Sequence, residues 1–272
     1  MIASINDTAQ KYLTLVNETN LIEFSLLLGT FGETYDGSDV KWAYTNEPIL
    51  NLIVDPRFPR EEADQRISAL IERFEGKGVR PSWIVGPSSR PSDIFDRLEE
   101  HGYNRASRPG MAADLNDLPE RIDPPAGYRI QEVTDLETLK TWGEVVCKSL
   151  DVPEPQSRSF QDLFARLGVC NAIPWKHYLG FLDGEPSSAC TVFEGSGVHG
   201  IYAMTVVPEC RRRGIGYSML WNVLNEVRNE GHRYAVLQTT PQSISFCERL
   251  GFVEHCEMTY YAPINTLNKK PV

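Results

Sequence analysis

The densest group of chemistry-bearing residues is V-V-P-E-C-R-R-R-G-I-G-Y-S-M, from Val206 to Met219. The pattern predicts a strand before this loop and a helix after it, so the loop presents free N–H groups and the positive end of the helix dipole. Gly214 and Gly216 let an anion approach those N–H groups, and Arg211–Arg213 add forked cationic donors. The stretch therefore predicts a phosphate site, best matched by a pyrophosphate.

The glycine spacing excludes two common nucleotide-binding motifs. It is not G-x-G-x-x-G, and no G-K-[ST] follows, so neither a Rossmann nor a Walker site is indicated. The formal net charge is −10, with 12 Lys and Arg against 20 Asp and Glu in residues 1–120. An acidic surface repels a nucleic-acid backbone and favours cationic ligands. We therefore expect no nucleic-acid partner.

Composition indicates a globular chain that forms its own core, with 41% apolar and 24% charged residues. The first 20 residues lack a signal-peptide pattern, and no run of about 18 apolar residues indicates a membrane span. The six cysteines include no C-x-x-C pair, so neither a disulfide framework nor a metal site is expected. We expect a cytoplasmic protein without a membrane partner.

The elements that position the arginine loop can be read around it. In chain order we expect a strand at 128–133, helical segments within 136–167, strands at 178–182, 188–193 and 201–207, a helix at 216–229, a strand at 234–238, a helix at 240–250 and a strand from 252. Asp183-Gly184 predicts a hairpin turn, and Gly231 is placed to end a helix. Thr240-Pro241 predicts a helix start. Leu118–Gly127, rich in proline, predicts a linker between two halves.

These residues resemble a known family. R-R-R-G-I-G on a strand-loop-helix resembles the R/Q-x-x-G-x-G/A signature of the GNAT superfamily of acyl-CoA-dependent N-acetyltransferases. S-I-S-F-C-E-R-L-G-F, Ser243 to Phe252, is similar to that family's A-x-x-L-Y-x-x-x-G-F. The resemblance covers about residues 127–263. It implies an α/β (α+β) fold whose mixed sheet splays open between the strands at 201–207 and 234–238 to hold acetyl-CoA.

The resemblance also implies site residues. It assigns the pyrophosphate to Arg211, Arg212, Arg213, Gly214, Ile215, Gly216 and Tyr217. It implies that the backbone of Met204 and Val206 pairs with the pantetheine arm, and that Thr240 touches the same arm.

Two positions depart from the family pattern. Cys247 stands where the family has a tyrosine that protonates the leaving thiolate, and Gly200 stands where a glutamate often acts as base. Cys247 is therefore a candidate acid, and also a candidate small apolar core residue. His255 and Glu254, on a strand that borders the acceptor side in the family, are candidate bases, and also candidate surface groups. These three are the candidate catalytic residues.

The first half repeats the order of elements in the second. A strand at 51–55, a helix at 61–74, a strand at 83–85 and a helix at 92–101 precede Gly102-Tyr103. The equivalent loop, R-F-P-R-E-E-A-D-Q, has no glycine and carries three carboxylates. We expect residues 1–120 to form a degenerate GNAT-like domain without a cofactor site, and residues 121–272 to form the acetyl-CoA-binding domain. The alternative is an unrelated α/β domain in the first half.

The resulting hypothesis is an N-acetyltransferase that acetylates a primary amine of a small molecule. A non-catalytic acyl-CoA-binding module and a protein or peptide N-acetyltransferase remain as alternatives. Transfer from an aminoacyl-tRNA is disfavoured by the negative charge. The surplus carboxylates of the first half suggest a cationic acceptor.

Overall fold

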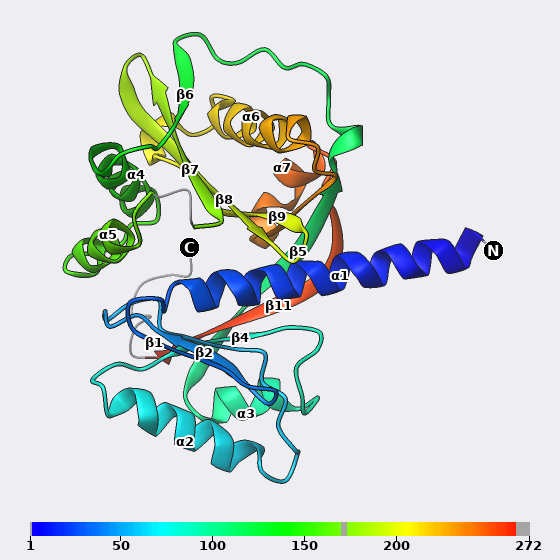
Figure 1. Cartoon of the computed structure of the whole chain (residues 1–272), viewed down its shortest axis with the longest axis vertical. Helices are drawn as coiled ribbons and strands as arrows, with labels where there is room; N and C mark the ends of the chain where they lie inside the picture. Colours follow the sequence, from blue (N-terminus) through cyan, green and yellow to red (C-terminus); the bar gives the residue numbers. More distant parts are fainter. Residues whose placement is uncertain (1, 170–172, 265–272) are drawn as a thin grey trace.

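One mixed sheet of eleven strands runs through the whole of the computed structural model, which describes residues 2–169 and 173–264 (Figure 1). The strand order is β1-β2-β3-β4-β11-β5-β10-β9-β8-β7-β6. The strands are β1 Glu33–Asp36, β2 Lys41–Tyr44, β3 Leu52–Val54, β4 Ser82–Val85, β5 Tyr103–Asp114, β6 Tyr128–Glu132, β7 Trp175–Leu182, β8 Glu185–Gly195, β9 Val198–Val206, β10 Tyr234–Gln238 and β11 Val253–Pro263. The helices are α1 Ile2–Leu27, α2 Ala63–Glu75, α3 Ile94–Glu100, α4 Leu136–Ser149, α5 Gln156–Leu167, α6 Ile215–Asn229 and α7 Ile244–Glu248.

The two halves of the chain share a pattern of elements. In the first half β3–α2–β4–α3–β5 follow one another, and in the second β9–α6–β10–α7–β11 do so. In each half the first two strands of the series pair in parallel, β3 with β4 and β9 with β10. The mixed α/β architecture expected from the sequence is therefore confirmed.

The two halves exchange their last strands at the centre of the sheet. β11, from the second half, pairs with β4 of the first half, while β5 of the first half pairs with β10 of the second. β5 and β11 also pair with each other along nearly their full lengths, from Ala112–Val253 to Tyr103–Pro263. The sheet is consequently continuous across both halves.

Helix α1 crosses the middle of this sheet and contacts strands of both halves (Figure 1). Its buried face carries polar side chains as well as apolar ones. Asn17 donates to the carbonyl of Met111 on β5, and Asn20 donates to the carbonyl of Gly195 on β8, both at 2.9 Å. These bonds satisfy strand carbonyls that the helix covers. α1 was not expected from the sequence.

Local signals in the second half were read correctly. Asp183 and Gly184 both have positive φ, as a two-residue hairpin turn requires. Gly231 ends α6 at φ +93°.

The helix expected at 240–250 is shorter, because residues 241–243 form a 3₁₀ turn before α7. The segment expected as a linker lies along α6, where the Trp221 indole donates to the Pro119 carbonyl at 2.8 Å. None of the described helices has the length and apolar character needed to span a membrane.

Candidate active site

The loop between β9 and α6 has the backbone shape of an anion site. Arg212 has φ +61° and Gly214 has φ +80°, so two left-handed residues lie just before the helix, while Arg211 before them is extended. Left-handed residues in a turn can direct successive N–H groups toward one concavity. The first helical bond runs from the Ser218 amide to the Gly214 carbonyl at 3.0 Å. The amides of 215–217, which precede this bond, belong to the unpaired first turn of the helix.

Contacts to α4 hold the loop in place. The Arg211 guanidinium donates to the carbonyl of Val206 at 3.0 Å and to that of Ser149 at 2.7 Å. Lys148 forms an ion pair with Glu209 in the same loop. Arg211 thus fixes the loop to the end of α4, whereas the side chains of Arg212 and Arg213 are exposed.

The residues that open α6 have different environments. Ile215 is buried in the core, so only its backbone faces the loop. A Cβ on Gly216 would lie 3.4 Å from Val206, 3.5 Å from Met204 and 3.7 Å from Phe246. Gly216 therefore faces the end of β9 and the start of α7, and a larger side chain would fill the space between them.

Strands β9 and β10 diverge beside this loop. In the described chain their pairing runs only from His199–Ala235 to Ile201–Leu237. β9 continues to Val206 with β8 as its partner, so the backbone of Met204 and Val206 is not paired with β10. A bulge in the β8–β9 register lies at this point, where Ala203 has φ +48°. Bulges re-aim strand groups and often lie next to active sites.

The fold brings a fourth arginine to the start of α6. The Arg249 guanidinium lies over the Tyr217 ring, 4.8 Å from its centroid. Arg249 belongs to the C-E-R-L-G-F landmark but was not recognised as a site residue, because its position depends on how the end of α7 packs against α6. It adds positive charge beside the loop.

Cys247 lies in the core and not at an open surface. Its side chain is 3% exposed, and its thiol contacts the Thr239 hydroxyl at 3.7 Å. Burial raises the pKa of this thiol. These observations match the small apolar core residue weighed as the alternative to a proton donor. Thr240, the residue after Thr239, contacts the Ser243 hydroxyl through its own hydroxyl at 3.2 Å.

His255 and Glu254 lie on β11, and β5 separates that strand from β10. The strand that borders β10 is thus β5, which comes from the first half of the chain. The His255 carbonyl accepts from the Thr14 hydroxyl of α1 at 3.0 Å, and burial lowers the pKa of the ring. Glu254 is exposed. Two strands, β5 and β10, therefore lie between β9 and the strand that carries both residues.

The space beside Gly200 is filled by the side chain of Asn20 on α1. A Cβ on Gly200 would collide with the Asn20 side-chain oxygen. That oxygen accepts a hydrogen bond from the Tyr202 hydroxyl at 2.8 Å, and Tyr202 stacks on Phe24 with ring centroids 3.8 Å apart. An amide of α1 therefore lies where the family pattern has a glutamate.

Comparison with known proteins identifies the class. Residues 145–252 match the model of the acetyltransferase (GNAT) family. The second half of the chain therefore carries a GNAT acetyltransferase domain, as its two sequence landmarks indicated.

Solved structures share the fold of nearly the whole chain. A GCN5-related N-acetyltransferase from Kribbella flavida has a TM-score of 0.65 at 19% identity, over 89% of this chain and 94% of that one. A GCN5-related N-acetyltransferase from Sphaerobacter thermophilus has a TM-score of 0.59 at 16% identity, over 82% and 76%. A tandem GNAT protein from the clavulanic acid biosynthesis pathway has a TM-score of 0.51 at 16% identity, over 82% and 77%. At these identities the likeness concerns the fold.

Proposed function

We propose that this protein transfers the acetyl group of acetyl-CoA to a primary amine of a small molecule. The observation that carries the proposal is the pair of left-handed residues, Arg212 and Gly214, directly ahead of α6 and beside the part of β9 that has left β10. A loop of this shape suits a pyrophosphate, and a strand backbone that is unpaired on its β10 side suits an amide-bearing arm.

The residues present fit coenzyme A. The amides of 212–217 would hold the pyrophosphate, with charge from Arg212, Arg213 and Arg249. The backbone of Met204 and Val206 would hold the pantetheine arm, and Gly216 leaves room beside them. When bound, acetyl-CoA supplies a thioester that a neutral amine can attack.

Positioning accounts for most of the catalysis that we expect. Holding an amine and a thioester in line is worth about 7–11 kcal/mol. A general acid adds about 10²–10⁴-fold, so burial of Cys247 does not by itself exclude turnover. The thiolate is already a tolerable leaving group at its usual pKa of about 8.5.

One observation favours a second candidate, a non-catalytic acyl-CoA-binding module. Cys247 is buried in the core, and Asn20 fills the space beside Gly200, so neither usual acid–base position carries an ionisable group that faces β9. The module and the enzyme share one binding site and differ only in turnover.

In this proposal the first half forms one side of the acceptor pocket and holds no second cofactor. Its equivalent loop is tied by the Arg57–Asp55 ion pair, at 2.7 Å, and by a hydrogen bond from Arg57 to Ser88, at 3.1 Å. The Glu18 carboxylate of α1 accepts from the Ser88 amide and hydroxyl in the same place. The acidic balance of this half supports an acceptor that bears positive charge.

The decisive experiment combines acetyl-CoA thiol release, over a panel of mono- and polyamines, with direct measurement of CoA affinity. The double variant Arg212→Glu/Arg213→Glu should weaken CoA binding at least about tenfold, because a charge-assisted hydrogen bond contributes about 1.5–3 kcal/mol. Arg60→Glu is the matched control, since Arg60 is exposed in the equivalent loop of the first half and pairs with Asp93. It should leave CoA affinity unchanged.

A second pair of variants tests the loop conformation. Gly214→Ala and Gly78→Ala replace glycines with nearly equal φ, +80° and +79°, and each should lose about 1–2 kcal/mol of stability. Only Gly214→Ala should also weaken CoA binding. CoA binding without thiol release from any amine would favour the module, and absence of CoA binding would overturn the proposal.

A further inference from the structure

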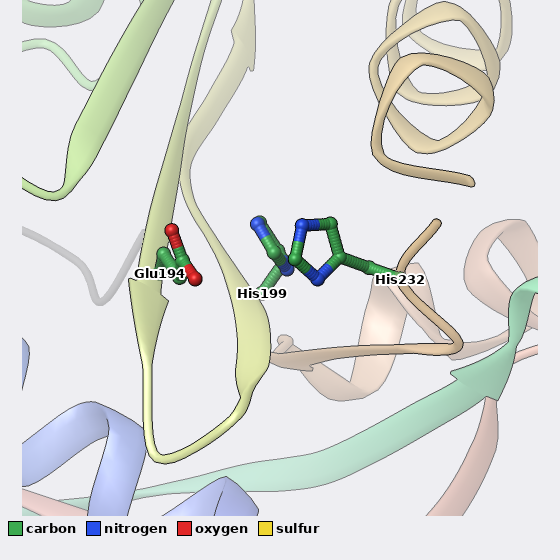
Figure 2. Close-up of side chains that lie close together, drawn as sticks. All are labelled: Glu194, His199 and His232. Carbon is green, nitrogen blue, oxygen red and sulfur yellow. The ribbon is translucent and has the colours of Figure 1, made fainter. Parts of the chain in front are cut away.

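Away from the arginine loop, three side chains converge that the acetyl-transfer chemistry does not use. One ligand atom from each of Glu194, His199 and His232 lies within 4.8 Å of the other two (Figure 2). Two imidazoles and one carboxylate are a donor set that divalent transition metals prefer, whereas Mg²⁺ and Ca²⁺ prefer oxygen ligands alone. No metal site was expected from the cysteine spacing, and this group contains no cysteine.

The backbone fixes two of these residues opposite each other. Glu194 and His199 are directly paired across the β8–β9 hairpin, so their side chains leave the same face of the sheet. The turn between them is tight, with positive φ at Ser196 and Gly197. Little rearrangement is therefore needed to bring the carboxylate and the imidazole to one ion.

A helix cap fixes the third residue. Gly231 has φ +93°, its amide donates to the Arg228 carbonyl at 3.0 Å, and the amide of His232 donates to the Val227 carbonyl at 3.3 Å. This is the bonding pattern of a Schellman motif, which sets the direction of the residue after the glycine. The His232 ring lies against the His199 ring, with centroids 4.1 Å apart.

His199 has the features of a ligand without its ion. His199 is 5% exposed, and its Nδ1 atom has no hydrogen-bond partner among the described residues. Buried polar atoms are normally satisfied, so an unpaired nitrogen on a buried imidazole points to a missing partner.

The surroundings leave room for a fourth ligand. A cavity of about 270 Å³ borders Glu194 and His199 and is also lined by Lys176 and Glu230. The Lys176 ammonium forms ion pairs with Glu226 and Glu230, so its charge is compensated. A three-residue site with an open position resembles the arrangement in which protein-bound zinc keeps a water molecule.

We propose that Glu194, His199 and His232 bind one divalent transition-metal ion, with Zn²⁺ as the best match. The ion joins the β8–β9 hairpin to the turn between α6 and β10, at the end of β9 where His199 is still paired with Ala235. It lies at the opposite end of β9 from the arginine loop, so the proposal does not depend on acetyl transfer.

The test uses the full-length protein without a polyhistidine tag, stripped with a chelator and dialysed. Zn²⁺ affinity is measured by competition with a chromophoric chelator, and Co²⁺ is added separately for its visible spectrum. We expect one ion per chain and weak d–d bands without a thiolate-to-metal band, since the ligands are nitrogen and oxygen. Zn²⁺ should also raise the unfolding temperature of the wild-type protein.

Two variants and a control identify the ligands. His232→Ala and Glu194→Gln alter a partly exposed turn residue and an exposed strand residue, so both should fold without metal. Each should lower Zn²⁺ affinity at least about tenfold, since even outer-shell partners of a metal cost about 10–100-fold. His101→Ala is the control, because His101 lies in the first half beside Asp64, and it should bind as the wild type does.

Three outcomes would overturn the proposal. One is a wild-type protein that takes up no stoichiometric metal. Another is unchanged affinity in both His232→Ala and Glu194→Gln. The third is a thiolate-to-cobalt band that persists in these variants, which would assign the ion to cysteines.

Discussion

A single carboxylate of α1, that of Glu18, lies buried against the loop that follows β4 in the first half of the chain. Glu18 is 4% exposed, and its Oε1 atom accepts from the Ser88 hydroxyl at 2.8 Å and from the Ser88 amide at 3.1 Å. Burial raises the pKa of Glu18, and nearby Asp55 raises it further, against the lowering effect of the Ser88 bonds and of Arg57. The loop after β4 is thus held by a carboxyl group whose pKa lies above its ordinary value.

The raised pKa of Glu18 predicts a pH dependence of stability. Because the folded-state pKa of Glu18 lies above the ordinary value of 4.5, the folded state keeps a proton that the unfolded state has lost. Its contribution is fully present below about pH 4.5 and is lost as the pH rises through the folded pKa, by about 1.4 kcal/mol for each pH unit that separates the folded and unfolded pKa values. Glu18→Gln removes this loss. Urea unfolding from about pH 4 to pH 8 should show the variant gaining relative to the wild type, and parallel profiles would contradict the assignment.

At the scale of elements, α1 joins strands that come from both halves. Asn17 lies between β5 and β10, because it donates to Met111 and its side-chain oxygen accepts from Gln238 at 2.8 Å. Asn20 lies over β8 and β9 and is fully buried. Hydrogen bonds to strand backbone and side chains therefore add to the apolar contacts that hold the helix.

Removing one of these amides should therefore destabilise the protein. Asn20→Ala leaves the Tyr202 hydroxyl and the Gly195 carbonyl without their partner, and a buried unsatisfied polar group costs about 1–3 kcal/mol. Thr19→Ala is the neighbouring control, because the Thr19 hydroxyl donates to carbonyls within α1, those of Leu15 and Val16. Its free energy of unfolding should stay within about 0.5 kcal/mol of the wild type. If urea unfolding shows equal losses of unfolding free energy in both variants, the hydrogen bonds of Asn20 do not hold α1 to the sheet.

For the whole molecule, the exchange of β5 and β11 makes each half incomplete alone. Without β11 the first half exposes the edges of β4 and β5, and without β5 the second half exposes β10. Unpaired sheet edges promote aggregation. The two halves thus depend on each other for their central pairing.

We expect the full chain to unfold in one transition, with coincident curves for circular dichroism and for tryptophan fluorescence, because both halves bury tryptophans, such as Trp83 in the first and Trp142 in the second. Residues 1–120 and 121–272 expressed separately should not unfold cooperatively. Their co-expression should restore a folded complex. A cooperative transition of either half alone would contradict this expectation.

The sequence predicted the elements whose signals are local. The turn at Asp183-Gly184 and the end of α6 at Gly231 follow from backbone conformations that glycine favours. The arginine loop followed from residue types at one helix start. These features depend on neighbours within a few residues, and they include most of the candidate cofactor site.

The features that were not predicted depend on distant contacts. α1 was missed because its buried face carries Asn17, Glu18 and Asn20, which break the apolar period of a surface helix. The β5–β11 pairing joins residues more than a hundred positions apart and leaves no local pattern. The same holds for the Glu194, His199 and His232 group, since the hairpin pair and the helix cap meet only in the folded chain.

The place of β11 in the sheet also has a consequence for biosynthesis. β4 and β5 are translated long before residues 253–263, which fill the gap between them. A nascent chain therefore emerges from the ribosome with a gap between β4 and β5 that no earlier segment fills. Until the final strand inserts there, nascent protein is a natural client for chaperones that shield open sheet edges.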